Sequence, residues 1–132
     1  MTHTLAIRVY YEDTDLAGIV YYANYLKFIE RARSEWVRKL GIDQTRLRAD
    51  EGLVFAVRRV EADYLSPARF DDMLEVRTQL IALTGARIVL GQAVWRGARC
   101  LFDAKVTLIV LTDAGRAARI PKALRERLAS SA

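Results

Sequence analysis

Apolar residues recur every three or four positions in the segment that begins near Ala23. The apolar positions are Tyr25, Ile29, Ala32, Trp36 and Leu40. This period matches the 3.6-residue turn of an α-helix with one buried face. Asn24 can cap the start of this helix, and Gly41 can end it. A helix of about 17 residues is about 25 Å long, which is enough to cross a whole sheet.

Runs of β-branched and aromatic residues predict strands in most of the remaining chain. One short strand precedes the helix and four longer ones follow it, at residues 5–11, 53–65, 73–82, 87–96 and 99–111. Short glycine-containing turns, Thr84-Gly85-Ala86 and Gly97-Ala98, link the last three strands, which predicts an antiparallel meander. Residues 73–82 alternate clearly, with one face made of Leu74, Val76, Thr78 and Leu80. Pro121 precedes a short C-terminal helix, KALRERLA.

One long helix and one sheet predict a two-layer α+β domain. Neighbouring apolar residues place apolar side chains on both faces of this sheet, in the pairs Phe55 and Ala56, Val89 and Leu90, and Leu108 and Ile109. A single helix covers only one of the two faces. The uncovered apolar face favours contact with a second subunit, so we expect a homo-oligomer.

The length and composition fit one globular domain that spans residues 1–132. The apolar fraction is 52% and the charged fraction is 28%, which is typical of a soluble protein. No stretch approaches the roughly 18 consecutive apolar residues of a transmembrane helix, and the N-terminal segment lacks the pattern of a secretory signal. The single cysteine, Cys100, fits a reducing compartment. We therefore expect a cytoplasmic protein.

The formal net charge of +5 favours anionic partners, such as nucleic acid, a membrane surface or a phosphorylated small molecule. Most of the cations are arginines, whose planar guanidinium suits phosphate. The excess charge is spread along the chain, and many proteins this basic bind nothing in particular. No recognition helix, zinc site or aromatic stacking platform is evident in the sequence, so we expect no nucleic-acid partner.

Three carboxylates, Glu12, Asp13 and Asp15, lie just before the predicted long helix. The helix begins near Tyr22, and its first amides have no acceptor within the helix and carry positive partial charge. They can stabilise an oxyanion, and Gly18 lets a ligand approach the backbone closely. A carboxylate beside such a site is the minimum for acyl-transfer hydrolysis. The alternative is a solvated acidic loop that precedes a helix.

Other catalytic machinery is mostly missing from the sequence. The only histidine, His3, lies near the N-terminus, where we expect a frayed end, so a Ser-His-Asp triad or a Cys-His pair is not expected. Cys100 lies in an apolar strand and fits a core position better than a nucleophile. Metal sites built on histidine or cysteine lack ligands, and no phosphate-binding loop is present. We expect no metal and no cofactor.

The segment from Arg8 to Ile42, which contains YEDTDLAGIVYYANY, strongly resembles the 4-hydroxybenzoyl-CoA thioesterase family of hotdog proteins. Within that family it is most similar to the bacterial Tol–Pal-associated acyl-CoA thioesterases, and Phe55–Val76 shares this similarity. The resemblance implies a hotdog fold, in which a curved five-stranded antiparallel sheet wraps one long central helix. It also implies hydrolysis of an acyl-CoA and dimers, joined sheet edge to sheet edge, that often pair into homotetramers with active sites at the dimer interface.

The same resemblance implies roles for particular residues. Asp15 matches the catalytic carboxylate, which attacks the thioester carbonyl or activates water. The backbone amide of Tyr22 matches the group that polarises the carbonyl. Asp13 and Gly18 match positions that shape the loop, and Gly18, Ile19 and Val20 are expected to contact substrate. Many close relatives have histidine at Tyr22, which leaves the acyl preference open.

Arginines are candidates for binding the CoA phosphates, although no motif marks them. Arg58 and Arg59 interrupt a strand, and one of the pair is expected on the less favourable face, where it lines a ligand channel or pairs with a carboxylate. The other candidates are Arg69, Arg87 and Lys122. An alternative function is a non-catalytic hotdog module that binds acyl carrier protein or cell-envelope partners, because a basic surface suits an acidic carrier protein.

Overall fold

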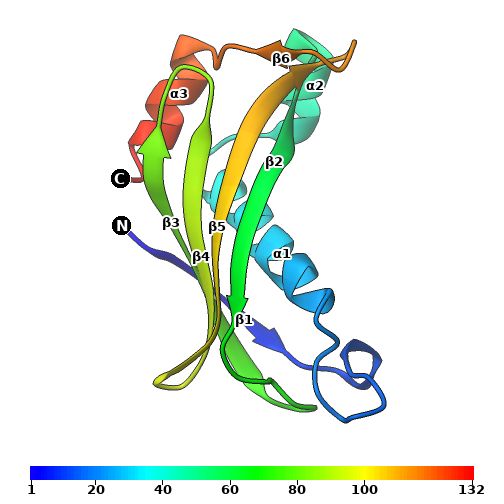
Figure 1. Cartoon of the computed structure of the whole chain (residues 1–132). Helices are drawn as coiled ribbons and strands as arrows, with labels where there is room; N and C mark the ends of the chain where they lie inside the picture. The colour runs from blue at the N-terminus through cyan, green and yellow to red at the C-terminus, as the bar shows by residue number, and fades with distance from the viewer.

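The computed structural model describes residues 1–132, which form a layer of helices and a curved antiparallel sheet (Figure 1). The elements are β1 (His3–Arg8), α1 (Asn24–Lys39), α2 (Gln44–Glu51), β2 (Leu53–Tyr64), β3 (Met73–Leu83), β4 (Ile88–Arg96), β5 (Arg99–Thr112), β6 (Ala117–Ala118) and α3 (Lys122–Ala129). This order confirms the predicted α+β class, with a long helix that follows the first strand.

The sheet has the strand order β1-β3-β4-β5-β2, and every pair is antiparallel. The predicted meander is therefore correct for β3, β4 and β5. A sixth strand was not predicted: β6 pairs with the end of β5 at Val110 and Leu111. It has only two residues, which is too short to leave a hydrophobic period in the sequence.

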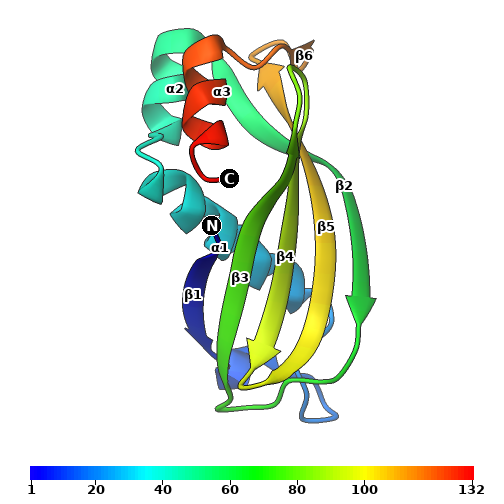
Figure 2. The same ribbon diagram turned by 90° about the vertical axis from the view of Figure 1, so that its left-hand side faces the viewer.

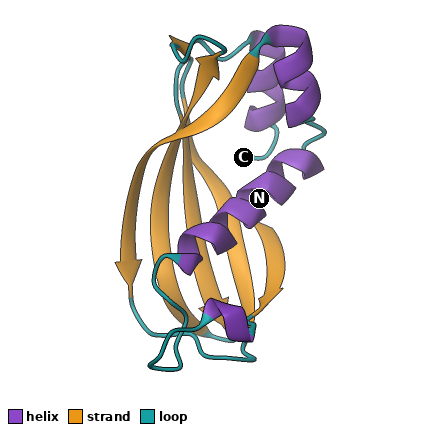
Figure 3. Cartoon of the chain, turned by 90° about the vertical axis from the view of Figure 1, so that its right-hand side faces the viewer, coloured by secondary structure: helices purple, strands orange, loops and turns teal.

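Helix α1 runs diagonally across the inner face of the sheet, as the two side views show (Figures 2 and 3). The predicted stripe is buried at Tyr25, Ile29, Ala32 and Trp36, whereas Leu40 is only partly buried. Phe28 and Val37 add to the same face. These side chains pack against the inward residues of the sheet in a single cluster of 27 buried residues. The apolar contact between α1 and the sheet therefore provides most of the core.

The start of α1 differs from the expectation. The capping residue is Ala23, and Asn24 is the first residue of the helix. The Asn24 side chain instead donates from Nδ2 to the carbonyl oxygen of Asp13 at 2.9 Å. The proposed Asn24 cap was therefore wrong, because its amide ties the helix start to the acidic loop. Gly41, with φ of +81°, follows the helix as predicted.

Helix α2 was not predicted, because Leu47 is its only buried residue and gives no apolar stripe. Local capping defines the helix instead. The Asp43 side chain accepts a hydrogen bond from the Arg46 amide at 3.1 Å, and Gly52 ends the helix in the left-handed region with φ of +65°. Both residues are sequence signals for a helix that hydrophobic periodicity alone does not detect.

Candidate active site

Asp13 anchors the loop that carries the three carboxylates. Its side chain accepts a hydrogen bond from the Tyr10 amide at 2.8 Å and closes a short 3-10 turn over Tyr11–Asp13. Its carbonyl oxygen accepts from the Tyr21 amide at 2.9 Å and from the Asn24 side chain. Asp13 thus joins the beginning of the loop to the beginning of α1.

Asp15 lies at the start of a small hairpin turn. Its amide donates to the Ile19 carbonyl oxygen at 2.9 Å, and its own carbonyl oxygen accepts from the Gly18 amide at 2.9 Å. Gly18 has φ of +79°, a conformation that favours glycine. The Asp15 Oδ1 atom accepts from the Ala17 amide at 2.9 Å, while Oδ2 has no partner in the chain. The carboxylate is therefore oriented through one oxygen, and its other oxygen carries no hydrogen bond within the chain.

The far side of the hairpin packs on the segment between β2 and β3. Val20 is buried, and its amide donates to the Ala68 carbonyl oxygen at 2.8 Å, while Ile19 forms an isolated bridge with Arg69. The Ala68 amide in turn donates to the Tyr25 hydroxyl at 3.0 Å. The candidate substrate contacts Ile19 and Val20 therefore also hold the loop on the core, and Arg69 participates through its backbone.

Asp72 stabilises this supporting segment. Its Oδ2 atom accepts from the Arg69 amide and from the Arg96 guanidinium, both at 2.8 Å. Burial opposes ionisation of Asp72, but these donors outweigh it and hold the pKa of the carboxyl below its usual range. Sequence reasoning missed this residue, because its charged partner Arg96 lies 24 residues further along the chain.

We expect Asp72→Asn to lower the free energy of unfolding by about 1 kcal/mol at pH 7, since it weakens a charge-assisted pair. A lowered pKa means that the ionised carboxylate stabilises the folded state above its ordinary pKa of about 3.9, and that this stabilisation is lost as pH falls through the folded pKa. Urea unfolding at pH 7 and near pH 3 measures both effects. The exposed neighbour Asp71→Asn is the matched control. Equal losses for the two variants at pH 7 would contradict the assignment.

Tyr22 lies where the loop meets α1. Its carbonyl oxygen accepts a hydrogen bond from the Tyr64 hydroxyl at 3.0 Å, and no acceptor in the chain lies within range of its amide. Burial raises the pKa of the Tyr64 phenol, with Tyr22 and Tyr25 adding to the shift, so the phenol stays protonated as a donor. Tyr22 is 62% exposed, and its ring meets the Tyr64 ring edge to face at 6.1 Å. The free amide is thus held in a fixed orientation beside an aromatic wall.

Arg58 and Arg59 lie on the same face of the sheet, contrary to the expectation that alternation separates them. The register of β2 against β5 shifts between Val57 and Arg59, which marks a β-bulge. A bulge places two residues opposite one, so the usual alternation fails there. Both arginines line a hollow of about 390 Å³ on the outer face, together with Arg87 and Lys105.

This hollow gathers three of the five predicted basic candidates in one place. Arg69 lies instead at the acidic loop, and Lys122 is the first residue of α3. Lys105 was missed, although the alternation of β5 sends it to the same outer face as Thr107. Arg59 already pairs with Glu61 at 2.6 Å, which leaves Arg58, Arg87 and Lys105 as three cations of the hollow without a carboxylate partner.

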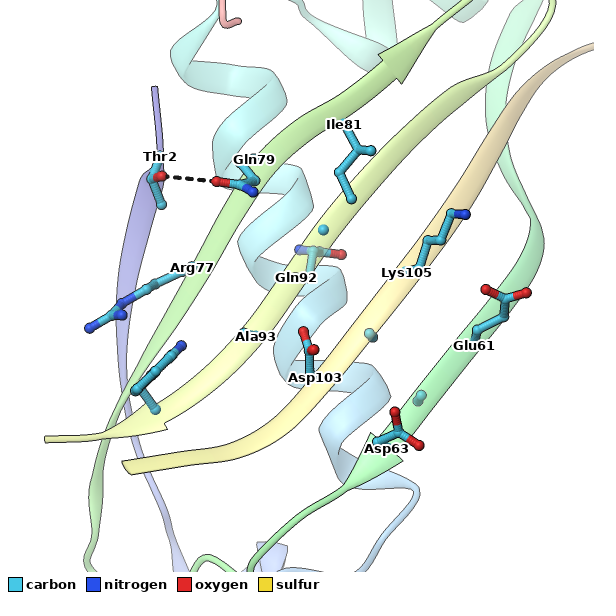
Figure 4. Close-up of a pocket in the computed structure, with 14 residues that line it drawn as sticks. Thr2, Glu61, Asp63, Arg77, Gln79, Ile81, Gln92, Ala93, Asp103 and Lys105 are labelled. Atoms are coloured by element: carbon cyan, nitrogen blue, oxygen red, sulfur yellow. Dashed lines mark hydrogen bonds between the residues drawn. The ribbon is translucent and has the colours of Figure 1, made fainter. Parts of the chain in front are cut away.

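A second hollow, of about 790 Å³, lies further along the outer face (Figure 4). Its lining is largely polar and includes Glu61, Asp63, Arg77, Asp103 and Lys105. The expectation that the uncovered outer face is apolar is therefore wrong for this part of the sheet. Exposed apolar side chains lie instead along β2, at Val57, Val60 and Tyr64, and around the acidic loop.

An inner pocket of about 260 Å³ separates α1 from β2, and no sequence pattern predicted it. Its apolar wall is made of Val37, Phe55, Ala56, Val57 and Leu108. Its polar wall comes from Glu30, Arg33, Ser34 and Gln44. The pocket has the mixed lining that is typical of small-molecule sites, an apolar body with a few polar groups.

The remaining candidates for chemistry are structural. His3 is the first residue of β1 and pairs with Thr78, so the expected frayed end was wrong. Burial raises the pKa of the Cys100 thiol, which disfavours the reactive thiolate. No group of three or more histidine, cysteine or acidic side chains could hold a metal ion. No helix is long and apolar enough to cross a membrane.

A long helix packed on a curved antiparallel sheet defines a two-layer domain of the hotdog type. Residues 17–100 match the family model of the thioesterase superfamily. The acyl-CoA thioester hydrolase YbgC of Escherichia coli O157:H7 is 41% identical over 107 residues, which are 81% of this chain and 79% of that protein. The acyl-CoA thioesterase YbgC of Haemophilus influenzae is 41% identical over 110 residues, 83% and 80% of the two chains.

Solved structures agree with this assignment. A probable thioesterase from Bartonella henselae superposes with a TM-score of 0.86 at 37% identity, over 92% of this chain and all of that one. An aspartate-to-asparagine mutant of 4-hydroxybenzoyl CoA thioesterase in complex with 4-hydroxybenzoyl CoA has a TM-score of 0.89 at 22% identity, over 96% and 98% of the chains, and supports the fold. The chain belongs to the thioesterase superfamily and has the hotdog fold.

Proposed function

We propose that the protein hydrolyses acyl-CoA thioesters, with Asp15 as the catalytic carboxylate and the Tyr22 amide as the donor to the thioester carbonyl. The observation that carries the proposal is the loop itself. Asp13 and Asn24 tie the loop to the start of α1, Asp15 has a free oxygen, and Tyr22 has a free amide. Relatives named acyl-CoA thioester hydrolases supply the substrate class. Residues 1–132 act as one domain.

In the proposed reaction the Tyr22 N–H stabilises the negative charge that develops on the carbonyl oxygen. The Asp15 carboxylate either attacks the carbonyl carbon or takes a proton from an attacking water. Attack expels the CoA thiolate and leaves a mixed anhydride, which water then hydrolyses. Proton abstraction delivers hydroxide to the carbonyl carbon directly. Both routes consume one water and give the free acid and CoA.

We propose that each active site is shared between two chains. One chain supplies Asp15, and the other supplies the inner pocket, which holds the acyl group. Within a chain, Tyr64 next to the catalytic loop and Ala56 in the inner pocket are eight residues apart on β2, roughly 26 Å. The free edge of β2 can pair with β2 of a second copy. An antiparallel pair centred near Val60 places the Tyr64 end of one strand beside Ala56 of the other. The homo-oligomer is this dimer, alone or paired into a tetramer.

The CoA phosphates bind in the basic hollow of Arg58, Arg59, Arg87 and Lys105. We expect Arg58→Ala with Arg87→Ala to raise KM for acyl-CoA at least about tenfold and to weaken its salt dependence, because phosphate contacts are charge-assisted. An acyl-pantetheine substrate lacks the nucleotide and its phosphates, so its kcat/KM should change much less. Arg116→Ala, in the turn after β5, is the control. Equal losses on both substrates would exclude a phosphate-binding role.

A thiol-release assay tests the proposed function. It uses short, medium, long and aromatic acyl-CoAs, and release of CoA from at least one of them at enzymatic rates is the expected result. The competing hypothesis of a binding module predicts capture of acyl carrier protein, or of a cell-envelope partner, without release of thiol from any member of the panel. That outcome would overturn the proposal.

A further inference from the structure

A polar cluster crosses the otherwise apolar contact between α1 and the sheet. Gln92 on β4 is fully buried, and its Nε2 atom donates to the Ile29 carbonyl oxygen on α1 and to the Thr78 hydroxyl on β3, both at 2.9 Å. Its Oε1 atom accepts from Nη1 of Arg33 at 3.0 Å. The Arg33 side chain therefore points inward from α1 and is held by the core.

The same Arg33 side chain lines the inner pocket. The opposite wall, which β2 and β5 provide, is apolar and includes Phe55, Ala56 and Leu108. An acyl chain that extends along this wall reaches Arg33, whose guanidinium is anchored on Gln92 and cannot swing freely into solvent. Arg33 thus forms a polar end to an apolar pocket.

The partly buried guanidinium of Arg33 has no carboxylate partner to offset the loss of hydration of its charge. No carboxylate oxygen lies within 4.0 Å of it, although five other arginine–carboxylate pairs form in the chain. Burial lowers its pKa, and the more distant Glu30 carboxylate acts in the opposite direction. Further apolar contact would remove the remaining water from this cation, which is unfavourable.

We propose that Arg33 is a specificity-determining residue that sets the upper limit on acyl-chain length, so that the enzyme prefers short acyl groups. Short chains fill the apolar part of the pocket without reaching the guanidinium. Longer chains must either displace the Arg33–Gln92 contact or place methylene groups against a charge. The pocket volume of about 260 Å³ lies just below the roughly 300–1,000 Å³ of ordinary ligand pockets, consistent with this limit. The inference rests on the proposed function.

The test compares kcat/KM over a series of saturated straight-chain acyl-CoAs for the wild type and Arg33→Met. We expect the ratio of kcat/KM for dodecanoyl-CoA to that for butyryl-CoA to rise at least about tenfold in the variant, since a methylene in an apolar pocket is worth about that factor. Arg31→Met is the matched control, because Arg31 is exposed on the same helix and reaches no pocket. An unchanged ratio in Arg33→Met, or an equal rise in Arg31→Met, overturns the inference.

Loss of Arg33 leaves Gln92 Oε1 without a donor, which can impair folding. The double variant Arg33→Met/Gln92→Met removes both partners and should show the same rise in the ratio. Ala56→Leu narrows the opposite wall and should shift the preference the other way. If no wild-type acyl-CoA is hydrolysed, the proposed function fails. If hydrolysis depends on Asp15 but neither Arg33 variant changes the chain-length ratio, only the role of Arg33 fails.

Discussion

Asp15→Asn is expected to lower kcat on the best acyl-CoA at least about a hundredfold, the usual contribution of a catalytic acid or base. Asparagine keeps the oxygen that accepts the Ala17 amide hydrogen bond, so the hairpin turn should persist. It replaces the free carboxylate oxygen with an amide, which can neither attack a carbonyl carbon nor take a proton from water. The side chain is exposed, so little stability depends on its charge.

Glu12→Gln is the matched control for Asp15→Asn, because Glu12 is also an exposed acid of the same loop. We expect its kcat to stay within a few-fold of the wild type. Thermal unfolding of both variants, followed by circular dichroism, separates chemical from structural loss. An Asp15→Asn enzyme that is folded and keeps most of its activity would contradict the catalytic assignment. A loss shared equally by Glu12→Gln would mean that loop charge, and not one carboxylate, supports turnover.

The elements that the sequence predicted well are those with a strong period. The stripe of α1 from Tyr25 to Trp36 and the alternation of β3 each repeat over several turns or residue pairs, and tertiary contacts reinforce them. Helix α2 has a single buried residue and depends on the Asp43 cap and Gly52, so periodicity could not detect it. Short elements need local capping signals in place of apolar spacing.

The site could be predicted only where its residues are adjacent in sequence. Asp13, Asp15 and Tyr22 lie in one loop, and the resemblance of that loop to known thioesterases marked them as candidates. Tyr64 and Asp72 support the same loop from distant positions, and no local signal links them to it. Nonlocal contacts of this kind emerge only when the sheet closes against the helix.

Arg58 and Arg59 show a second limit of prediction from the sequence, which concerns the face of the sheet that a side chain occupies. Alternation is a rule for regular strands, and one extra residue in β2 reverses its outcome for every side chain on one side of the shift. The bulge converts two adjacent arginines into neighbours on one face, beside Arg87 and Lys105. The proposed phosphate site therefore depends on an irregularity that the hydrophobic pattern does not encode.

Mixed oligomers of two inactive variants are expected to recover activity, because each active site of the proposed dimer takes Asp15 from one chain and the inner pocket from the other. Asp15→Asn lacks the carboxylate, and Ala56→Trp fills the pocket of about 260 Å³ with a large ring. In a mixed dimer one site combines both defects, and the other combines an intact Asp15 with an open pocket. We expect about half of the wild-type turnover per dimer, against at least about a hundredfold loss in either parent.

Co-expression of the two variants with different affinity tags, followed by tandem purification, isolates the mixed oligomer. The parents, mixed after separate purification and assayed at once, provide the control for residual activity. If both parts of the site came from one chain, the mixed oligomer would contain two defective sites and stay as inactive as its parents. In the proposed dimer, recovery requires the free edge of β2, so Val60→Pro in both chains should abolish it, since proline cannot donate a hydrogen bond to a paired strand. Dependence of the rescue on that edge would connect the unpaired strand directly to catalysis.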